Sequence, residues 1–399
     1  MNVRKSFPWR LIAALCACLL FTTLTLAQPS RNAPYYPERF EWQTRTPEQI
    51  GMDAARLDAA IKLSIASENP ASKDIAIDLA TTFGREPFDT PIGPVQPRGA
   101  LSGIVIKNGY IVAEWGDTLR VDMTHSVTKS FLSTVVGMLW QKGLIRDVTD
   151  PVRGYMPSPE LFDGPHNSKI TWEHLLRQTS DWQGTLWGKP DWADRPEGQT
   201  PADWPNRKLS EPGTRYKYND VRVNLLALAA LHVARRPLPE ILRDEVMEPI
   251  GASSTWRWHG YENSWIEIDG RRVQSVSGGG HWGGGMFISA RDMARFGYLF
   301  LRNGKWRDRQ IVSQKWIDMA RSPGPANADY GYANWFLNSG PKPYVPSGSK
   351  SAVTFVGNGN NIIHIDWERD MVIVVRWIRG GALNEFVGQV LGSIRASHP

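Results

Sequence analysis

Two stretches rich in β-branched residues, one towards each end of the chain, constrain the fold most strongly. The first, LSGIVIKNGYIVAEWG at 101–116, contains two short apolar runs joined by Asn108-Gly109, a dipeptide typical of tight β-hairpins. The second, at 354–377, contains two more such runs separated by a turn near 368–370. Helical patterns fill much of the chain between them. We therefore predict an α+β fold of three layers, in which strands from both termini form one antiparallel sheet flanked by helices.

The segments outside these strands show apolar residues at helical spacing. We expect helices over 54–67, 220–235 and 289–304, a shorter one over 170–180, and a final helix over 383–396.

Glycine and proline interrupt these patterns in two places. The stretch 81–99 is dense in both residues, and we expect it to be a loop. The segment 273–288 contains Gly278, Gly280 and Gly283 in the spacing G-x-G-x-x-G, which a dinucleotide site would also show. No alternating series of strands and helices surrounds it. We therefore interpret the glycines as places where the backbone turns tightly or approaches another element.

The first 27 residues have the pattern of an export signal. Arg4, Lys5 and Arg10 precede or open an uncharged apolar segment at 11–27, and the sequence TLA at its end offers a cleavage site. An uncleaved membrane anchor is the alternative, but the segment is near the short limit for spanning a bilayer. We expect cleavage, no stable membrane insertion afterwards, and a periplasmic or extracellular location. Both cysteines lie within this segment, so the remaining chain would hold no disulfide and no thiolate metal site.

The rest of the chain is expected to form one functional domain. Residues 28–40 are proline-rich and lack a hydrophobic period, which indicates a linker or a wrapping arm. The domain would cover 41–397, with sheet-forming parts at about 41–143 and 273–397 and a mostly helical insert at about 144–272. The net charge of +6 is too small to favour a nucleic-acid partner. The expected partner is a small molecule.

The segment MTHSVTKSFLSTVVGMLWQKG at 123–143 carries the residues best suited to catalysis. It opens on polar residues, continues as an apolar-rich helix and stops at Gly143. Ser126 and Lys129 are three residues apart, so in the first turn of a helix they project from one face and can touch. A serine beside an amine at the positive end of a helix is suited to nucleophilic attack. Because S-x-x-K also occurs by chance, the interpretation depends on the surrounding sequence.

Four further segments accompany SVTKS at 126–130. They are KGLIRDVTDPVRGYMP at 142–157, ITWEHLLRQTS at 170–180, EPGTRYKYND at 211–220 and SARDMARFG at 289–297. Together the five segments resemble the serine β-lactamase and penicillin-binding-protein superfamily. They are most similar to its class C β-lactamase-like branch, which includes esterases, D-aminopeptidases and 6-aminohexanoate-dimer hydrolases. The resemblance covers roughly 40–397 and implies the β-lactamase/transpeptidase fold, with no metal and no organic cofactor.

The resemblance implies a role for each motif residue. Ser126 would be the acylated nucleophile, and Lys129 would accept its proton. Tyr218 matches the tyrosine of the second family motif, Tyr-x-Asn, and would relay protons to the leaving group and from water. Tyr216, two residues earlier, is the competing candidate. The usual Asn is Asp220 here, and this carboxylate can either pair with Lys129 and keep the amine protonated, or cap the following helix.

The third family motif, Lys-Thr-Gly or His-Thr-Gly in many relatives, has no clear match. Its nearest counterpart includes Gly357, Asn358 and Gly359, where a backbone amide would join that of Ser126 in an oxyanion hole. The missing Lys or His would have held a substrate carboxylate. Its absence weighs against β-lactamase activity.

Several side chains outside the motifs are further candidates. His281, in the glycine-rich segment, would either line the pocket or make a loop hydrogen bond. Trp182 and Trp187, two of the 18 tryptophans, would either form a pocket wall or pack structurally. His125 precedes Ser126, but neighbouring side chains point apart, which disfavours it as a base.

These observations predict an exported serine hydrolase that cleaves an ester or amide bond through an acyl-enzyme on Ser126. A β-lactamase or D,D-peptidase is the first alternative. The second is a catalytically inactive module that binds a ligand or senses the cell wall, because Asp220 departs from the family motif.

Overall fold

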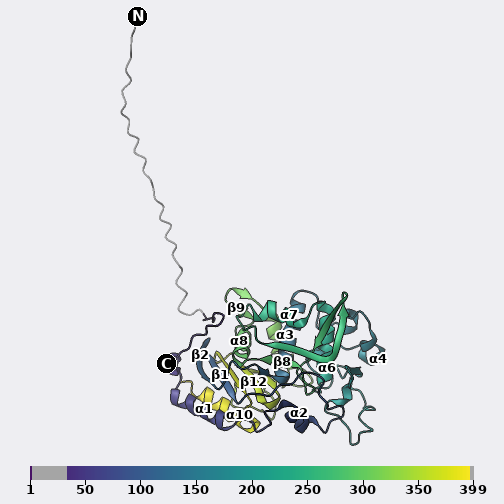
Figure 1. Ribbon diagram of the computed structural model, residues 1–399, viewed down its shortest axis with the longest axis horizontal. Helices are drawn as coiled ribbons and strands as arrows, with labels where there is room; N and C mark the ends of the chain where they lie inside the picture. The colour runs from purple at the N-terminus through teal and green to yellow at the C-terminus, as the bar shows by residue number, and fades with distance from the viewer. Residues whose placement is uncertain (2–33, 396–399) are drawn as a thin grey trace. The chain divides into compact units, whose positions relative to one another are not determined.

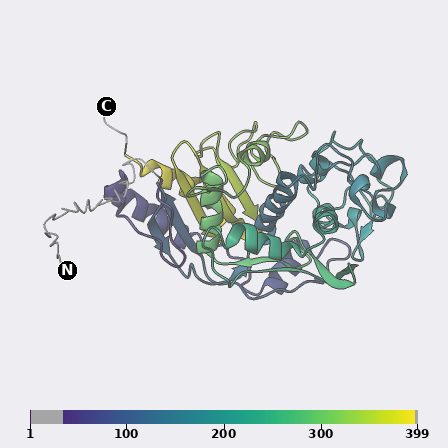
Figure 2. The ribbon, with the colours of Figure 1, turned by 90° about the horizontal axis from the view of Figure 1, so that it is seen from above.

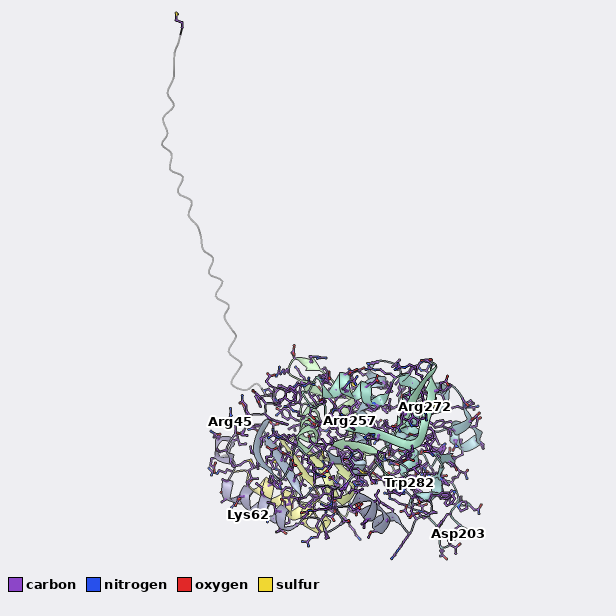
Figure 3. All side chains as sticks on the ribbon, viewed as in Figure 1. Arg45, Lys62, Asp203, Arg257, Arg272 and Trp282 are labelled. Carbon is purple, nitrogen blue, oxygen red and sulfur yellow. The ribbon has the colours of Figure 1, made fainter. Side chains whose placement is uncertain are left out.

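Strands from both ends of the chain lie side by side in one antiparallel sheet, as the sequence predicted. The computed structural model describes Met1 and residues 34–395, so the expected export signal at 1–27 lies outside the described residues. The sheet has the order β11-β12-β13-β1-β2, and all neighbouring pairs are antiparallel. Its strands are β1 (Ser102–Lys107), β2 (Tyr110–Trp115), β11 (Val353–Gly357), β12 (Asn361–Asp366) and β13 (Met371–Arg376). Figure 1 shows β2, β1 and β12 in this arrangement, and Figure 2 shows the yellow C-terminal strands beside the blue N-terminal hairpin.

The turn between β1 and β2 has the geometry that Asn108-Gly109 predicted. Both residues have positive φ, 52° and 88°, as a type I′ hairpin requires. A side chain at Gly109 would meet the Tyr298 hydroxyl at 2.5 Å, so glycine is needed here for space as well as for conformation.

Helices cover both faces of this sheet and give the predicted three layers. Alternate strand residues point to opposite faces. Ile104 and Ile106 share a buried cluster with α8 (Ala290–Leu301), whereas Val105 packs with α1 (Ala54–Ala66) and α10 (Gly380–Gly392). In Figure 1, α8 lies on one side of the sheet and α1 and α10 lie on the other. The strands are apolar on both faces because both faces are buried.

The inserted region contains more β-structure than the sequence suggested. A second antiparallel sheet has the order β3-β8-β6-β7. Its strands are β3 (Asp122–Met123), β6 (Arg257–Ile268), β7 (Arg271–Val276) and β8 (Gly285–Ile288). The 12-residue β6 lies inside the expected helical insert at 144–272. It was missed because its residues, RWHGYENSWIEI, mix polar, aromatic and glycine side chains and lack an obvious apolar run.

The helices of the insert are one long element and several short ones. They are α4 (Gly164–Asn167), α5 (Trp172–Leu176), α6 (Asp220–Ala234) and α7 (Leu238–Leu242). The helix predicted over 170–180 ends early, because Gln178 and Asp181 adopt positive φ. By contrast, α6 covers nearly the whole of its predicted span and is buried along its first 12 residues.

Three other boundaries differ from the predictions. The stretch 81–99 is not all loop, because α2 (Ile75–Phe83), capped by the Asp74 side chain, extends into it. The final helix is α10, which begins and ends a few residues before the predicted 383–396. Residues 35–37 of the expected linker pack on the domain, since all three are at least partly buried and Tyr35 stacks on Tyr110 with ring centroids 4.5 Å apart.

The remaining elements are small. They are β4 (Thr185–Leu186), β5 (Lys189–Pro190), β9 (Lys305–Trp306), β10 (Arg309–Gln310) and α9 (Gln314–Ala320). Among residues 34–395, no helix combines the length and the apolar character needed to cross a bilayer.

Candidate active site

Ser126 and Lys129 meet where the two sheets are joined. The chain leaves β3, makes a 3-10 turn at His125–Val127 and enters α3 (Thr128–Gln141). The buried guanidinium of Arg376, from β13, donates hydrogen bonds to the carbonyl oxygens of Met123 and Ile288. This fixes the start of the turn against the large sheet. The Lys129 Nζ lies 2.7 Å from the Ser126 Oγ, so the structure places these two side chains in the contact that their spacing predicted.

A cavity of about 360 Å³ opens above Ser126. Of the residues named from the sequence, eight line it: His125, Ser126, Tyr218, Asp220, Gly280, His281, Gly357 and Asn358. Lys129 lies beneath the cavity floor and is 1% exposed. The volume of this cavity is typical of a site for a small organic molecule.

Asp220 pairs with Lys129. Their charged atoms are 2.7 Å apart, and both side chains are almost fully buried. The helix cap is instead Asn219, whose side chain accepts a hydrogen bond from the amide of Arg222. Burial by itself would raise the pKa of Asp220, but the positive charges of Lys129 and Arg195 hold it well below its usual value. Asp220 is therefore a carboxylate that favours the ammonium form of Lys129.

Tyr218 occupies the position from which it can exchange a proton with the nucleophile. It lines the same cavity as Ser126, and the Lys129 Nζ lies 5.0 Å from its ring centroid. Burial and the negative charge of Asp220 raise the pKa of Tyr218 well above the usual value of a phenol. The resting side chain is thus a neutral phenol and a proton donor. The competing Tyr216 does not line the cavity; it packs on Tyr330, with ring centroids 5.1 Å apart.

The glycine-rich segment supplies a wall of the cavity, and its glycines permit close backbone approach. A side chain at Gly280 would lie 2.5 Å from Asp220, and one at Gly279 would collide with the His125 carbonyl oxygen. The sequence left two roles open for His281, lining the pocket or making a hydrogen bond, and the structure shows both. It lines the cavity, and its Nδ1 lies 3.1 Å from the Asp220 Oδ2. Its Nε2 is buried, has no hydrogen-bond partner and faces the Glu86 Oε2 at 3.4 Å.

Sequence patterns did not single out three charged residues that complete this site. The Arg195 guanidinium lines the cavity and contacts the carboxylates of Asp194 and Asp220. Asp194 also accepts a hydrogen bond from the amide of Asp220. The backbone amide of Arg195 donates to the Glu86 Oε2 at 3.1 Å. No motif marks these residues, because they come from irregular segments that only the fold brings to α6.

Glu86, Asp194 and His281 could in principle hold a cation, since one ligand atom from each lies within 4.8 Å of the others. The Arg195 guanidinium already contacts Asp194 and supplies positive charge at this point. We therefore assign the three residues to the hydrogen-bonded surroundings of Asp220.

The tryptophans singled out from the sequence lie away from the cavity. Trp182 is buried and donates its indole N–H to the Leu161 carbonyl oxygen at 2.6 Å, so it packs structurally. Trp187 is half-buried against the insert and does not line the cavity either. The aromatic wall is formed instead by Trp335 and Phe83, which the sequence did not single out.

The family assignment rests on a match that covers more than half of the chain. The family model described as Beta-lactamase matches residues 105–381, from β1 to the start of α10. The chain belongs to the beta-lactamase family. A curated relative, 6-aminohexanoate-dimer hydrolase of Paenarthrobacter ureafaciens, is 26% identical over 264 residues, which are 58% of this chain and 60% of that protein. The chain thus matches less than two thirds of that relative's length.

Solved structures show the same fold. A β-lactamase from Mycobacterium bovis superposes with a TM-score of 0.52 at 20% identity, covering 79% of this chain and 97% of the other. A penicillin-binding-protein homologue from Caulobacter crescentus gives 0.55 at 14% identity, covering 86% and 99%.

The segment predicted as the nearest counterpart of the third motif lies at the edge of the large sheet. Gly357 ends the edge strand β11, and a side chain there would lie 3.2 Å from the backbone nitrogen of Ser126. Glycine therefore lets the strand approach the nucleophile closely, as an oxyanion site requires. Asn358 lines the cavity, and its side-chain amide donates to the Asp78 carboxylate. Gly359 does not line the cavity and packs on Trp377 instead.

His125 is buried beside the nucleophile. Burial, together with the charges of Arg376 and Lys129, lowers the pKa of His125 to about 3, so it is a neutral imidazole at neutral pH. Its ring lies edge-on to Trp377, with centroids 5.7 Å apart, and its backbone has φ of 49°.

Proposed function

We propose that this protein is a serine hydrolase that cleaves an ester or small amide bond through an acyl-enzyme on Ser126. The observation that carries the proposal is the position of Lys129, whose Nζ lies 2.7 Å from both the Ser126 Oγ and the Asp220 Oδ1. A nucleophile, a base and a group that orients the base are the three parts of an activated serine. Membership of the beta-lactamase family and the likeness to a hydrolase of the 6-aminohexanoate dimer support the same reaction class.

In the proposed reaction, the Ser126 Oγ attacks the substrate carbonyl carbon, and its proton passes to the neutral amine form of Lys129. Asp220 is the counter-ion of Lys129 at 2.7 Å, so the neutral amine is available for this step only after a proton has left the pair. We therefore expect the rate to rise with pH. The carbonyl oxygen, which becomes negative, would face the Ser126 amide and the backbone near Gly357.

The leaving group departs with a proton from Tyr218. A neutral phenol beside Ser126 is suited to give a proton to the departing oxygen or nitrogen. The phenolate formed would recover its proton from Lys129. A water molecule then attacks the acyl-enzyme by the same steps in reverse, which releases the acid and restores Ser126.

An ester or small amide is a better substrate for this cavity than a β-lactam. A β-lactam carries a carboxylate that needs a cation. Among the described residues lining the cavity, Arg195 is the only lysine or arginine, and it already contacts Asp194 and Asp220. A third carboxylate, Glu86, accepts from its backbone amide. The surroundings therefore oppose a further negative charge.

The test is labelling with a fluorophosphonate probe, followed by mass spectrometry of the modified peptide. We expect the label on Ser126, turnover of p-nitrophenyl acetate, little turnover of nitrocefin, and loss of both label and turnover in Ser126→Ala. The absence of labelling and of turnover across esters, amides and lactams would instead support an inactive binding module.

Export forms part of the proposal. It is supported by the charged residues Arg4, Lys5 and Arg10 and the apolar segment at 11–27. Fractionation of cells that express the full chain is expected to recover a shortened protein in the periplasm or the medium. Recovery of the full-length chain in the membrane fraction would favour the uncleaved anchor.

A further inference from the structure

A second cavity adjoins the catalytic one and shares two side chains with it. Its volume is about 300 Å³, and Trp335 and Val356 line both cavities. Its other apolar lining residues are Phe336, Leu337, Pro343 and Tyr344. Polar groups are contributed by Asp329, Lys342 and Asn360. A mostly apolar space of this size suits an alkyl chain or an aromatic ring.

Trp335 lines both cavities and is held from several sides. Its backbone exchanges two hydrogen bonds with Thr354 of β11, at 2.9 and 2.8 Å. Its ring is nearly parallel to that of Tyr218, at 25° with centroids 5.9 Å apart, and lies edge-on to Tyr330 at 4.8 Å. The indole is therefore held in place beside the proton donor, on the side where the second cavity adjoins the first.

The same hydrogen bonds limit what can bind along the strand. An extended peptide adds to a sheet through the free N–H and C=O groups of an edge strand. At Thr354 those groups are already bonded to Trp335. At Thr354 the edge of β11 therefore cannot pair with an extended peptide. The space beside it can hold a single substituent of a substrate.

We propose that the second cavity binds the apolar part of the leaving group, an aliphatic or aromatic alcohol or amine. The proposal rests on the proposed serine-hydrolase function. In that mechanism Tyr218 gives its proton to the leaving atom, and Trp335 stacks on Tyr218. The cavity beyond Trp335 therefore lies on the leaving-group side of the bond that breaks. The bond from the Ser126 Oγ to the carbonyl carbon forms, the bond from that carbon to the leaving atom breaks, and the Tyr218 proton goes to the leaving atom.

The test compares two ester series, with the released acid measured by pH-stat titration. In the first series the alcohol grows from ethyl to butyl to hexyl acetate. In the second the acid grows from ethyl acetate to ethyl butanoate to ethyl hexanoate. We expect kcat/KM of the wild type to rise at least about tenfold along the alcohol series, because each buried methylene favours binding to the cavity.

Two positions in the same exposed loop provide the variant and its control. Pro343 lines the second cavity, whereas Pro341 is also exposed and does not line it. Pro343→Trp is expected to fill the cavity and to remove the gain along the alcohol series. Pro341→Trp is expected to retain the gain. Tyr344→Ala, which removes part of the wall, is expected to reduce the gain without filling the cavity.

The results separate this inference from the proposed function. Loss of the gain in Pro343→Trp, with the acid series unchanged, supports the inference. The inference is overturned if kcat/KM of Pro343→Trp still rises along the alcohol series. It is also overturned if that variant changes the acid series instead. Hydrolysis by the wild type without any dependence on alcohol length also overturns the inference while leaving the serine hydrolase intact. No hydrolysis of any ester, with Ser126 unlabelled by a fluorophosphonate, overturns both.

Discussion

Two buried ionic clusters lie close together in this molecule, and they are built differently. The first, here called the anchor cluster, consists of Asp181, Asp191, Arg207 and Arg222. The second, here called the cavity cluster, consists of Glu86, Lys129, Asp194, Arg195, Asp220 and His281. Both hold carboxylates next to cations in places with little access to water. They differ in charge balance and in position.

The anchor cluster is balanced and its carboxylates are saturated. Arg207 and Arg222 each bind both Asp181 and Asp191, at distances from 2.6 to 3.3 Å. The two remaining carboxylate oxygens accept from the backbone amides of Ser210 and Gly184. None of the four charged residues lines the catalytic cavity. This cluster ties the loop after α5 to the start of α6.

The cavity cluster is not balanced in charge. Three carboxylates, those of Glu86, Asp194 and Asp220, lie around the two basic side chains Lys129 and Arg195. The His281 Nε2 has no hydrogen-bond partner, and neither has the Arg222 Nη1 of the anchor cluster. The clusters therefore differ in charge and in position: an excess of carboxylates that opens onto a cavity indicates groups kept for a reaction rather than for stability.

The largest expected effect is on the nucleophile. Ser126→Ala should lower kcat/KM for p-nitrophenyl acetate by at least about 10³-fold, because the atom that forms the acyl-enzyme is lost. Ser133→Ala, at a buried position of the same helix outside the cavity lining, should change it less than a few-fold. Retained turnover in Ser126→Ala would refute the assignment of the nucleophile.

The second largest effect is expected on the free energy of unfolding when the anchor cluster loses a carboxylate. Asp181→Asn should lower the free energy of unfolding by about 3 kcal/mol, because Arg207 and Arg222 lose a buried counter-ion. Urea titration measures this change. The folded fraction should retain ester hydrolysis within a few-fold. A variant of unchanged stability that had lost activity would show that the anchor cluster takes part in catalysis.

Asp220→Asn should act on the pH dependence. Asp220 is the counter-ion of Lys129, and a carboxylate favours the charged form of an amine beside it. The acid limb of the profile of kcat/KM against pH should therefore move to lower pH. Asp220 itself does not produce this limb, because its pKa is already far below the usual range. An acid limb at the same pH in both proteins would contradict the proposed role of the ion pair.

The smallest effect is expected at Glu86. Burial raises the pKa of Glu86 above the usual 4.5, although the Arg195 amide opposes this shift. A carboxyl whose pKa is higher in the folded than in the unfolded protein costs stability as the pH rises past the unfolded value. Glu86→Gln should remove this cost and stabilise the protein by less than about 1 kcal/mol at pH 7.

This gain should disappear at about pH 3.5, where Glu86 is protonated in both states. Glu385→Gln, on the exposed side of α10, serves as the control and should show no such pH dependence. A gain of equal size at both pH values would point to a packing effect instead.

Local patterns predicted the elements that carry the nucleophile and the sheet. Asn108-Gly109 predicted the hairpin, and the spacing of Ser126 and Lys129 predicted their contact, because turns and helices fix geometry within a few residues. The insert was predicted less well. Strand β6 was taken as part of a helical region, since its stability comes from pairing with β7 and β8 rather than from its own composition.

What the sequence determined by itself is therefore the set of reacting groups and the elements that present them. The motif around Ser126 and the residues Tyr218 and Asp220 are readable as chemistry without coordinates. Only the tertiary structure decided which charges surround them. Glu86 and Arg195 come from irregular segments, and Trp335 from the end of a loop paired to β11, so no local periodicity could place them beside α3. Their positions depend on contacts between segments far apart in the chain, and those contacts exist only after the core has packed.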